Sequence, residues 1–394
     1  MRKALILPGA GARGAYQVGV LKGISSFLPK HAANPFSIVS GTSAGAINAA
    51  VLASRAMHFG RAVREMEHVW ANFKANQVFR TDNWAMLKSS LHWLFAIVFG
   101  GLGVRNPKSL LDNSPLRELL EHNIRLSRIA HAIERGYLDA LAVTASAYSS
   151  TQSLTFYQSR ESIQPWTRVR RIGRPAVIDV DHLLASAAVP FIFPPVLIGG
   201  EYFGDGSMRH RAPLSSAIHL GGERMLVIGV RDEHPDPEPL ASSPAGPPTL
   251  ADLSGYMLDT LFMDSLYADL ERLSRINLLL EQLGTKDLKP PLTGLRRLDT
   301  LIILPKEDIR EVAARHFTEL PRALRLLLRG LGVVNGDGMQ LVSYLLFEAG
   351  YTRELIAMGY RDAMSMEEEV RAFLYDQPMH TIDAPGFLKA DLLR

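Results

Sequence analysis

Two glycine-rich turns constrain the fold of this 394-residue chain more than any other feature. The first turn, residues 9–14, follows a short apolar run at 3–8 and precedes a segment at 15–27 with apolar residues at helical spacing. The second turn, residues 41–45, follows another apolar run at 36–40 and opens a further helical segment. A strand, a glycine turn and a helix, repeated in succession, predict an α/β protein with a mostly parallel sheet.

The rest of the chain divides into two parts. Over 1–218 we expect a mainly helical stretch at 63–135 and further strands at 140–147, 153–157 and 196–198. Over 219–394 we expect mainly helices, with strands at 225–230 and 301–304 and helical segments at 250–283 and 320–375. The proline-rich stretch at 232–248 is predicted to be an exposed loop. We therefore predict an α/β domain at 1–218 and a mainly helical C-terminal region at 219–394.

Composition excludes several classes of protein. The chain contains no cysteine, which excludes disulfide scaffolds, thiol nucleophiles and cysteine-ligated metal sites. Its 43 basic and 40 acidic residues give a net charge of +3, without the dense basic stripe typical of nucleic-acid binders, so no nucleic-acid partner is expected. No Asp or Glu precedes Glu65, so both glycine turns lie in a stretch of positive charge.

The first turn, Gly9-Ala10-Gly11-Ala12-Arg13-Gly14, matches the G-x-G-x-x-G fingerprint of dinucleotide-binding proteins. That fingerprint expects an acidic residue about twenty positions later for the ribose, and none is present. An arginine could replace it in an NADP-type site, so this interpretation is weakened and stays open. In any such turn, glycines allow backbone N–H groups to converge on a negative charge at a helix N-terminus.

The second turn, Gly41-Thr42-Ser43-Ala44-Gly45, is a G-x-S-x-G sequence between a predicted strand and helix. This is the context of a nucleophile elbow, which would expose Ser43. An α/β-hydrolase triad is disfavoured because Ser43 follows only the second predicted strand. The late histidines lie in no recognisable motif and are interpreted as surface or packing residues; they are His210, His219, His234, His316 and His380. A carboxylate is the alternative base, and Asp205-Gly206-Ser207 offers one, although Asp-Gly is also a common turn.

These three motifs together resemble the patatin-like phospholipase family, over about residues 4–215. The family pattern is a glycine-rich motif ending in Arg-Gly, then G-x-S-x-G, then Asp-Gly followed by a small residue. The small-residue segment at 185–190 also resembles one that precedes the family's aspartate, and residues 344–359 resemble some bacterial members more loosely. Ala10 replaces a frequent glycine, and Ser207 replaces the usual glycine or alanine.

The resemblance implies a three-layer fold, with a mostly parallel central sheet between helices, and a catalytic Ser43–Asp205 dyad without histidine. It implies that Gly41 and Gly45 flank the nucleophile and that Gly206 and Ser207 follow the base. An oxyanion hole would come from the first turn, namely Gly9, Gly11, Ala12, Arg13 and Gly14, with Arg13 adding positive potential. Neither a cofactor nor a metal is expected.

The expected activity is hydrolysis of fatty-acyl esters in phospholipids or lysophospholipids. An acyltransferase or transacylase using the same dyad, and a non-catalytic lipid-binding scaffold, are the alternatives. The apolar runs at 91–102 and 191–196 are candidates to line an acyl site or contact a membrane surface. Four basic residues are candidates to face anionic head groups: Arg61, Arg64, Lys74 and Arg80.

The expected location is cytoplasmic, with possible peripheral contact with a membrane. The apolar run after Arg2 and Lys3 is too short for a signal peptide, and the run at 91–102 would cover about 18 Å as a helix, too little to span a bilayer. The C-terminal helices offer a possible oligomer contact.

Overall fold

The computed structural model describes residues 1–80, 109–160, 163–210, 212–231, 248–283, 295–333, 338–379 and 382–383. Several predictions concern residues outside these ranges. They are the apolar run at 91–102, almost all of the proline-rich stretch at 232–248, and the histidines His234 and His380.

The described strands form one sheet in the order β11-β10-β9-β1-β2-β3-β4-β6-β5, and β8 pairs with both β3 and β7. The strands are β1 (Lys3–Leu7), β2 (Ile38–Thr42), β3 (Ala140–Ala147), β4 (Ser153–Ser159), β5 (Trp166–Arg168), β6 (Arg171–Pro175), β7 (Val196–Ile198), β8 (Glu201–Asp205), β9 (Arg224–Ile228), β10 (Asp299–Ile303) and β11 (Ile382–Asp383). Neighbouring strands from β11 to β3 are all parallel. The predicted mostly parallel α/β fold is confirmed.

The sheet brings the two glycine turns together. In the parallel pair β1 and β2, Leu7 is the partner of Gly41, so both strands end at the same edge of the sheet. The first turn leaves β1 there and the second leaves β2. Because β3 pairs antiparallel with β8, with Ala145 opposite Asp205, the end of β8 reaches the same region.

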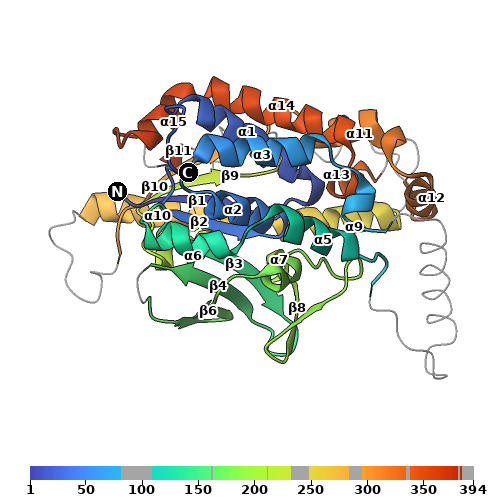
Figure 1. Cartoon of the computed structure of the whole chain (residues 1–394), viewed down its shortest axis with the longest axis horizontal. Helices are drawn as coiled ribbons and strands as arrows, with labels where there is room; N and C mark the ends of the chain where they lie inside the picture. Colours follow the sequence, from blue (N-terminus) through green and yellow to red (C-terminus); the bar gives the residue numbers. More distant parts are fainter. Residues whose placement is uncertain are drawn as a thin grey trace.

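Helices flank the sheet, and α1, α3 and α14 pack against one another on one side (Figure 1). The helices are α1 (Gly14–Ser26), α2 (Ala44–Ser54), α3 (Phe59–Ala71), α5 (Ser114–Asn123), α6 (Ser127–Glu134), α7 (Val180–Ser186), α8 (Ser215–His219), α9 (Leu250–Asp259), α10 (Ser265–Leu283), α11 (Ile309–His316), α12 (Arg322–Gly330), α13 (Met339–Leu345), α14 (Ala349–Ser365) and α15 (Glu367–Leu374). Short 3-10 turns include η1 (Gly11–Arg13) and η3 (Gly206–Met208), and α9 continues into α10 through a π-helical turn, η4 (Thr260–Asp264).

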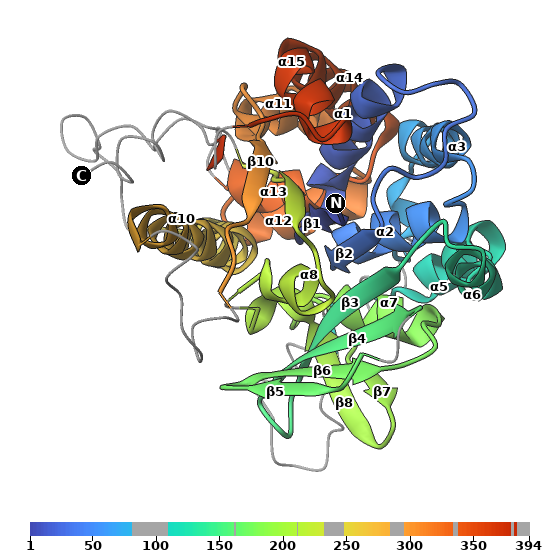
Figure 2. The same cartoon turned by 90° about the vertical axis from the view of Figure 1, so that its left-hand side faces the viewer.

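Residues after 218 contribute to the same sheet as the first 218. β9 pairs with β1, and β10 extends the sheet beyond β9 (Figure 2). Helix α14 packs along α1. The C-terminal half therefore lies against the strand and helix that enclose the first glycine turn.

Four strands were missed by the sequence patterns, and one of them, β11, has only two residues. β5 and β6 are short and rich in exposed polar residues, so they show no apolar alternation. β8 forms a hairpin with β7 across the turn at Gly199 and Gly200, so Asp205 is the last residue of a strand. Among the helices that the structure describes, none is long and apolar enough to cross a bilayer.

Candidate active site

Ser43 lies in the sharp turn between β2 and α2. Its backbone has φ 55° and ψ −129°, a region that non-glycine residues rarely adopt. The Ser43 N–H donates a hydrogen bond to Ser186 Oγ at 2.8 Å, and the Ser186 hydroxyl donates to the Thr144 carbonyl at 2.6 Å. This pair of bonds ties the strained turn to α7 and β3. A strained serine between a strand and a helix is what the predicted nucleophile elbow requires.

Small residues allow the elbow to approach the first glycine turn. A Cβ atom on Gly45 would lie 2.1 Å from the Leu7 carbonyl oxygen, so only glycine permits the start of α2 to lie against the end of β1. The other glycines predicted for the site each have a neighbour within 3.1 Å of the position a Cβ atom would take; they are Gly9, Gly14, Gly41 and Gly206.

Asp205 ends β8 with its carboxyl group buried beside Ser43. The side chain is 2% exposed, and Oδ1 accepts a hydrogen bond from the Ser207 N–H at 2.9 Å. Oδ2 is buried and has no hydrogen-bond partner among the described residues. Burial raises the pKa of Asp205 to about 6, and the Ser43 hydroxyl and the Ser207 N–H and hydroxyl oppose this rise. The Ser43 hydroxyl is thus close enough to the carboxyl group of Asp205 to lower its pKa.

The first glycine turn lies beside Ser43, because Gly11 and Ser43 line the same cavity. Gly11 has φ 51°, and a Cβ atom there would lie 2.6 Å from the Tyr344 carbonyl oxygen. The Arg13 N–H donates to the Ala10 carbonyl at 3.0 Å, so this N–H is used within the turn and is not free to bind a ligand. Within the part of the chain that the structure describes, the N–H groups of Gly11 and Ala12 have no protein acceptor. Both N–H groups are therefore available to an anion.

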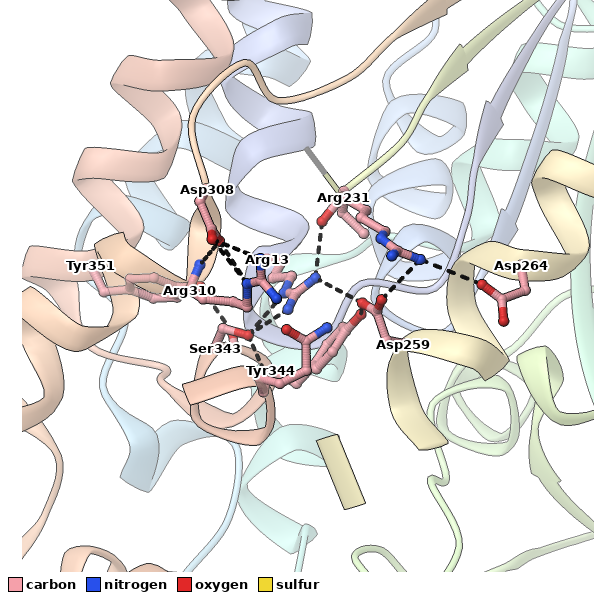
Figure 3. A network of polar contacts seen from close by, with 11 residues as sticks. Arg13, Arg231, Asp259, Asp264, Asp308, Arg310, Ser343, Tyr344 and Tyr351 are labelled. Atoms are coloured by element: carbon pink, nitrogen blue, oxygen red, sulfur yellow. Dashed lines mark hydrogen bonds and ion pairs between the residues drawn. The ribbon is translucent and has the colours of Figure 1, made fainter. Parts of the chain in front are cut away.

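The Arg13 side chain lies among residues of the C-terminal half of the chain (Figure 3). Its guanidinium is 2% exposed, donates to Ser343 Oγ at 2.7 and 2.9 Å, and pairs with Asp259 Oδ1 at 3.3 Å (Figure 3). It also donates to the Val230 carbonyl at 3.2 Å. The positive charge is thus shared with a buried carboxylate of α9. Arg13 links the first glycine turn to the C-terminal half of the chain.

A cavity of about 650 Å³ begins at Ser43 and Gly11. The side chains around it are mostly apolar, and α2, α3 and α5 supply much of the wall. The C-terminal half supplies part of the wall near Ser43, namely Leu258, Phe262, Tyr344, Leu345 and Phe347. The site is therefore completed by residues beyond 218.

Some of the residues that the sequence suggested for lipid contact line this cavity, and others do not. Ile192 and Phe193, from the apolar run at 191–196, line it. Arg61 and Arg64 also line it, whereas Lys74 and Arg80 do not, and Arg80 pairs with Asp112. The run at 91–102 lies outside the described residues.

Of the late histidines singled out in the sequence, the three that the structure describes have packing or surface contacts, as interpreted from the sequence. His210 contacts the Thr42 hydroxyl at 3.2 Å, and burial lowers its pKa to about 4. His219 stacks on Trp166, and His316 lies between Glu319 and Glu354. Among the described residues, no group of three or more His, Asp or Glu side chains could hold a metal ion.

Sequence reasoning missed four residues that hold the site together. Ser186 lies within the small-residue segment at 185–190, whose composition signalled close approach without indicating a hydrogen bond. Thr144 is an ordinary strand residue, and Asp259 and Ser343 lie in amphipathic helices. No local pattern distinguishes these three.

The chain was compared with known protein families, curated proteins and solved structures. A family model described as patatin-like phospholipase matches residues 5–218. None of the curated proteins compared with the chain matches it. The crystal structure of VipD from Legionella pneumophila is similar with a TM-score of 0.38 and 12% identity, over 100% of this chain and 74% of that one.

Proposed function

Because the chain belongs to the patatin-like phospholipase family, we propose that it hydrolyses fatty-acyl esters of phospholipids or lysophospholipids with Ser43 as nucleophile and Asp205 as base. The family membership itself supports lipid acyl hydrolase activity. The observation that carries the residue assignment is the buried Asp205 carboxyl, whose unpartnered Oδ2 and raised pKa of about 6 accompany a serine in a strained elbow. A carboxylate with a pKa near neutrality is a more effective proton acceptor than an ordinary aspartate.

In the proposed first step, Ser43 Oγ attacks the ester carbonyl carbon and its proton passes to Asp205. The carbonyl oxygen becomes an oxyanion that the N–H groups of Gly11 and Ala12 stabilise; one such donor is typically worth about 3–4 kcal/mol. The C–O bond to the alcohol then breaks, and Asp205 returns the proton to the departing oxygen. The acyl group remains on Ser43.

In the second step, water attacks the acyl-enzyme while Asp205 accepts its proton. The oxyanion forms again at the same N–H groups, the bond to Ser43 Oγ breaks, and the proton returns to Oγ. A free fatty acid leaves and the enzyme is regenerated. No histidine is needed, because one carboxyl group both accepts and donates the proton.

The apolar cavity supports a long-chain acyl substrate. Its volume of about 650 Å³ is that of a small-molecule site, and its apolar wall begins at Ser43. An acyl chain bound there would leave water together with the reacting ester. A lipid ester would therefore bind better than a small polar one.

Release of fatty acid from purified protein mixed with phospholipids, lysophospholipids and acylglycerols tests the proposal. Wild type should release fatty acid, and Ser43→Ala and Asp205→Asn should each abolish release. A fluorophosphonate probe should label wild type and not Ser43→Ala. Full activity of both variants would exclude the dyad. Adding acyl acceptors to the same assay measures transfer, and transfer without hydrolysis would identify an acyltransferase.

A further inference from the structure

The cavity follows one face of α2 from end to end. Ser43 directly precedes this helix and Arg55 directly follows it, and both line the cavity. Between them the cavity is lined by Ala44, Ile47, Asn48 and Val51. Positions one, four, five and eight residues after Ser43 lie on the same side of a helix. The cavity is thus a channel parallel to the helix axis.

The opposite wall, α3, runs antiparallel to α2. Near Ser43, Trp70 Nε1 donates to Asn48 Oδ1 at 3.0 Å. At the other end, Glu65 of α3 pairs with Arg55. Met66 and Val69 line the cavity between these contacts, and Leu116 and Leu120 of α5 add a further apolar wall. The channel wall between these two contacts is therefore mostly apolar, with Asn48 as a polar member near Ser43.

The end of the channel far from Ser43 is charged. Glu65 pairs with Arg55 and also with Arg61 at 3.0 Å, and Arg64 and Arg125 line the same end. The Arg61 side chain is 64% exposed, so this rim reaches solvent. An alkyl chain extending beyond the rim would meet guanidinium groups and water, where further methylenes gain no burial.

The length of α2 sets the distance between the two ends. Twelve residues separate Ser43 from Arg55, which at a helical rise of about 1.5 Å per residue is about 18 Å. A staggered alkyl chain with C–C bonds near 1.5 Å and angles near 111° advances about 1.25 Å per carbon, so about 14 carbons fill this distance.

We infer that the channel between α2 and α3 measures the acyl chain, with the ester carbonyl at Ser43 and the methyl end at the Arg55–Glu65–Arg61 rim. The preferred acyl chains have about 14 carbons. This inference rests on the proposed function, because it places the carbonyl at Ser43. Each methylene buried in the channel raises kcat/KM by up to about fourfold, and methylenes beyond the rim add nothing.

The experiment measures kcat/KM for a series of p-nitrophenyl esters from butanoyl to octadecanoyl in mixed detergent micelles. For wild type, kcat/KM should rise with acyl-chain length up to about 14 carbons and then level off. The chain length at which the rise ends is called the break. Val51→Trp places a large side chain eight residues, about 12 Å, from Ser43, and should move the break to about 10 carbons. Ile47→Trp, four residues from Ser43, should move it to about 5 carbons. The matched control is Val177→Trp, whose site is 78% exposed and outside the channel, and whose profile should equal that of wild type.

The order of the breaks is the decisive result. A break that moves with the position of the tryptophan along α2 supports the inference, and if one variant does not fold, the other and the wild-type profile still decide. A wild-type kcat/KM that keeps rising to the longest ester, or an unchanged break in folded Val51→Trp and Ile47→Trp, overturns it. If the esters are hydrolysed at rates that do not depend on chain length, this inference is wrong but the proposed function stands. Hydrolysis of no ester in the series removes the proposed function.

Discussion

The guanidinium carbon of Arg13 lies 3.9 Å from the centroid of the Tyr344 ring, and Tyr344 lines the cavity that begins at Ser43. The Tyr344 hydroxyl donates to Asp259 Oδ1 at 2.9 Å, and the same oxygen pairs with Arg13. Three side chains thus join the first glycine turn, α9 and α13 in one buried contact (Figure 3). The backbone of Gly11, two residues before Arg13, touches Tyr344 as well. The position of the predicted oxyanion N–H groups therefore depends on the C-terminal half of the chain.

Replacing Arg13 should lower both stability and turnover. Arg13→Gln removes the cation from a buried ion pair, a change that typically costs about 3–5 kcal/mol. The first glycine turn also loses its attachment to α13, so kcat for a short-chain ester should fall while KM changes little. Urea unfolding and steady-state kinetics measure the two effects.

Arg224→Gln is the matched control for this change. Arg224 is also 2% exposed and pairs with an aspartate, Asp299, but it does not line the cavity. It should lose stability and keep the kcat of wild type at a temperature where it is folded. Equal loss of kcat in both variants would show that Arg13 acts through general stability alone.

The activity should depend on pH through Asp205. The base must be ionised to accept the Ser43 proton, so kcat/KM should rise with pH and reach half its maximum near pH 6, where burial places this pKa. Below that pH, the rate should fall tenfold per unit. A pH profile with a soluble ester measures it, and a midpoint near the ordinary aspartate pKa of 3.8 would contradict the assignment.

The Ser207 hydroxyl should affect the pH at which activity reaches half its maximum. Its N–H and its hydroxyl both lower the pKa of Asp205, and Ser207→Ala removes only the hydroxyl. The midpoint of the pH profile should therefore move upward relative to wild type. The opposite displacement, or none, would mean that the hydroxyl does not act on the carboxyl group.

The contribution of Asp205 to the stability of the fold should fall as pH rises, whereas activity should rise. The folded pKa of Asp205, about 6, lies above its ordinary value of 3.8, so the folded state binds the proton more tightly. This contribution to stability is fully present below 3.8 and is lost as pH rises toward about 6. The loss amounts to about 3 kcal/mol.

Asp205→Asn should therefore be inactive and more stable than wild type above about pH 7, by up to about 3 kcal/mol. Urea unfolding at acidic and at neutral pH measures the difference between the two proteins. The gain should shrink as the pH falls, because the wild-type carboxyl group is then neutral as well. A difference that stays constant with pH would contradict a buried, ionised Asp205.

Sequence patterns identified the parts of the site that depend on local chain geometry. Gly41–Gly45 predicts a turn because small residues are needed beside a strained serine, and Asp205-Gly206 likewise predicts a chain reversal. The partners of Arg13 could not be found this way. Asp259 and Ser343 follow it by 246 and 330 residues, and nothing in their own segments signals an arginine.

The channel was also invisible in the sequence. Its walls come from α2, α3 and α5, whose apolar residues have the same spacing as an ordinary packing face. Only the antiparallel arrangement of α2 and α3 turns these faces into a channel. Strands β5 and β6 were missed for the reverse reason: most of their side chains are exposed or only partly buried, so they need no apolar alternation.

Replacing Ser186 should disturb the elbow itself. Ser186→Ala removes the acceptor of the Ser43 N–H, which is buried and would remain unpaired at a cost of about 1–3 kcal/mol. The elbow conformation at φ 55° then loses the bond that holds it, so Ser43 should react more slowly with a fluorophosphonate probe well below the unfolding temperature. Ser254→Ala is the control, because Ser254 donates an exposed hydrogen bond to the Leu250 carbonyl within α9 and should change neither property. A labelling rate equal to that of wild type in Ser186→Ala would show that the sheet and α2 alone hold the serine in its reactive position.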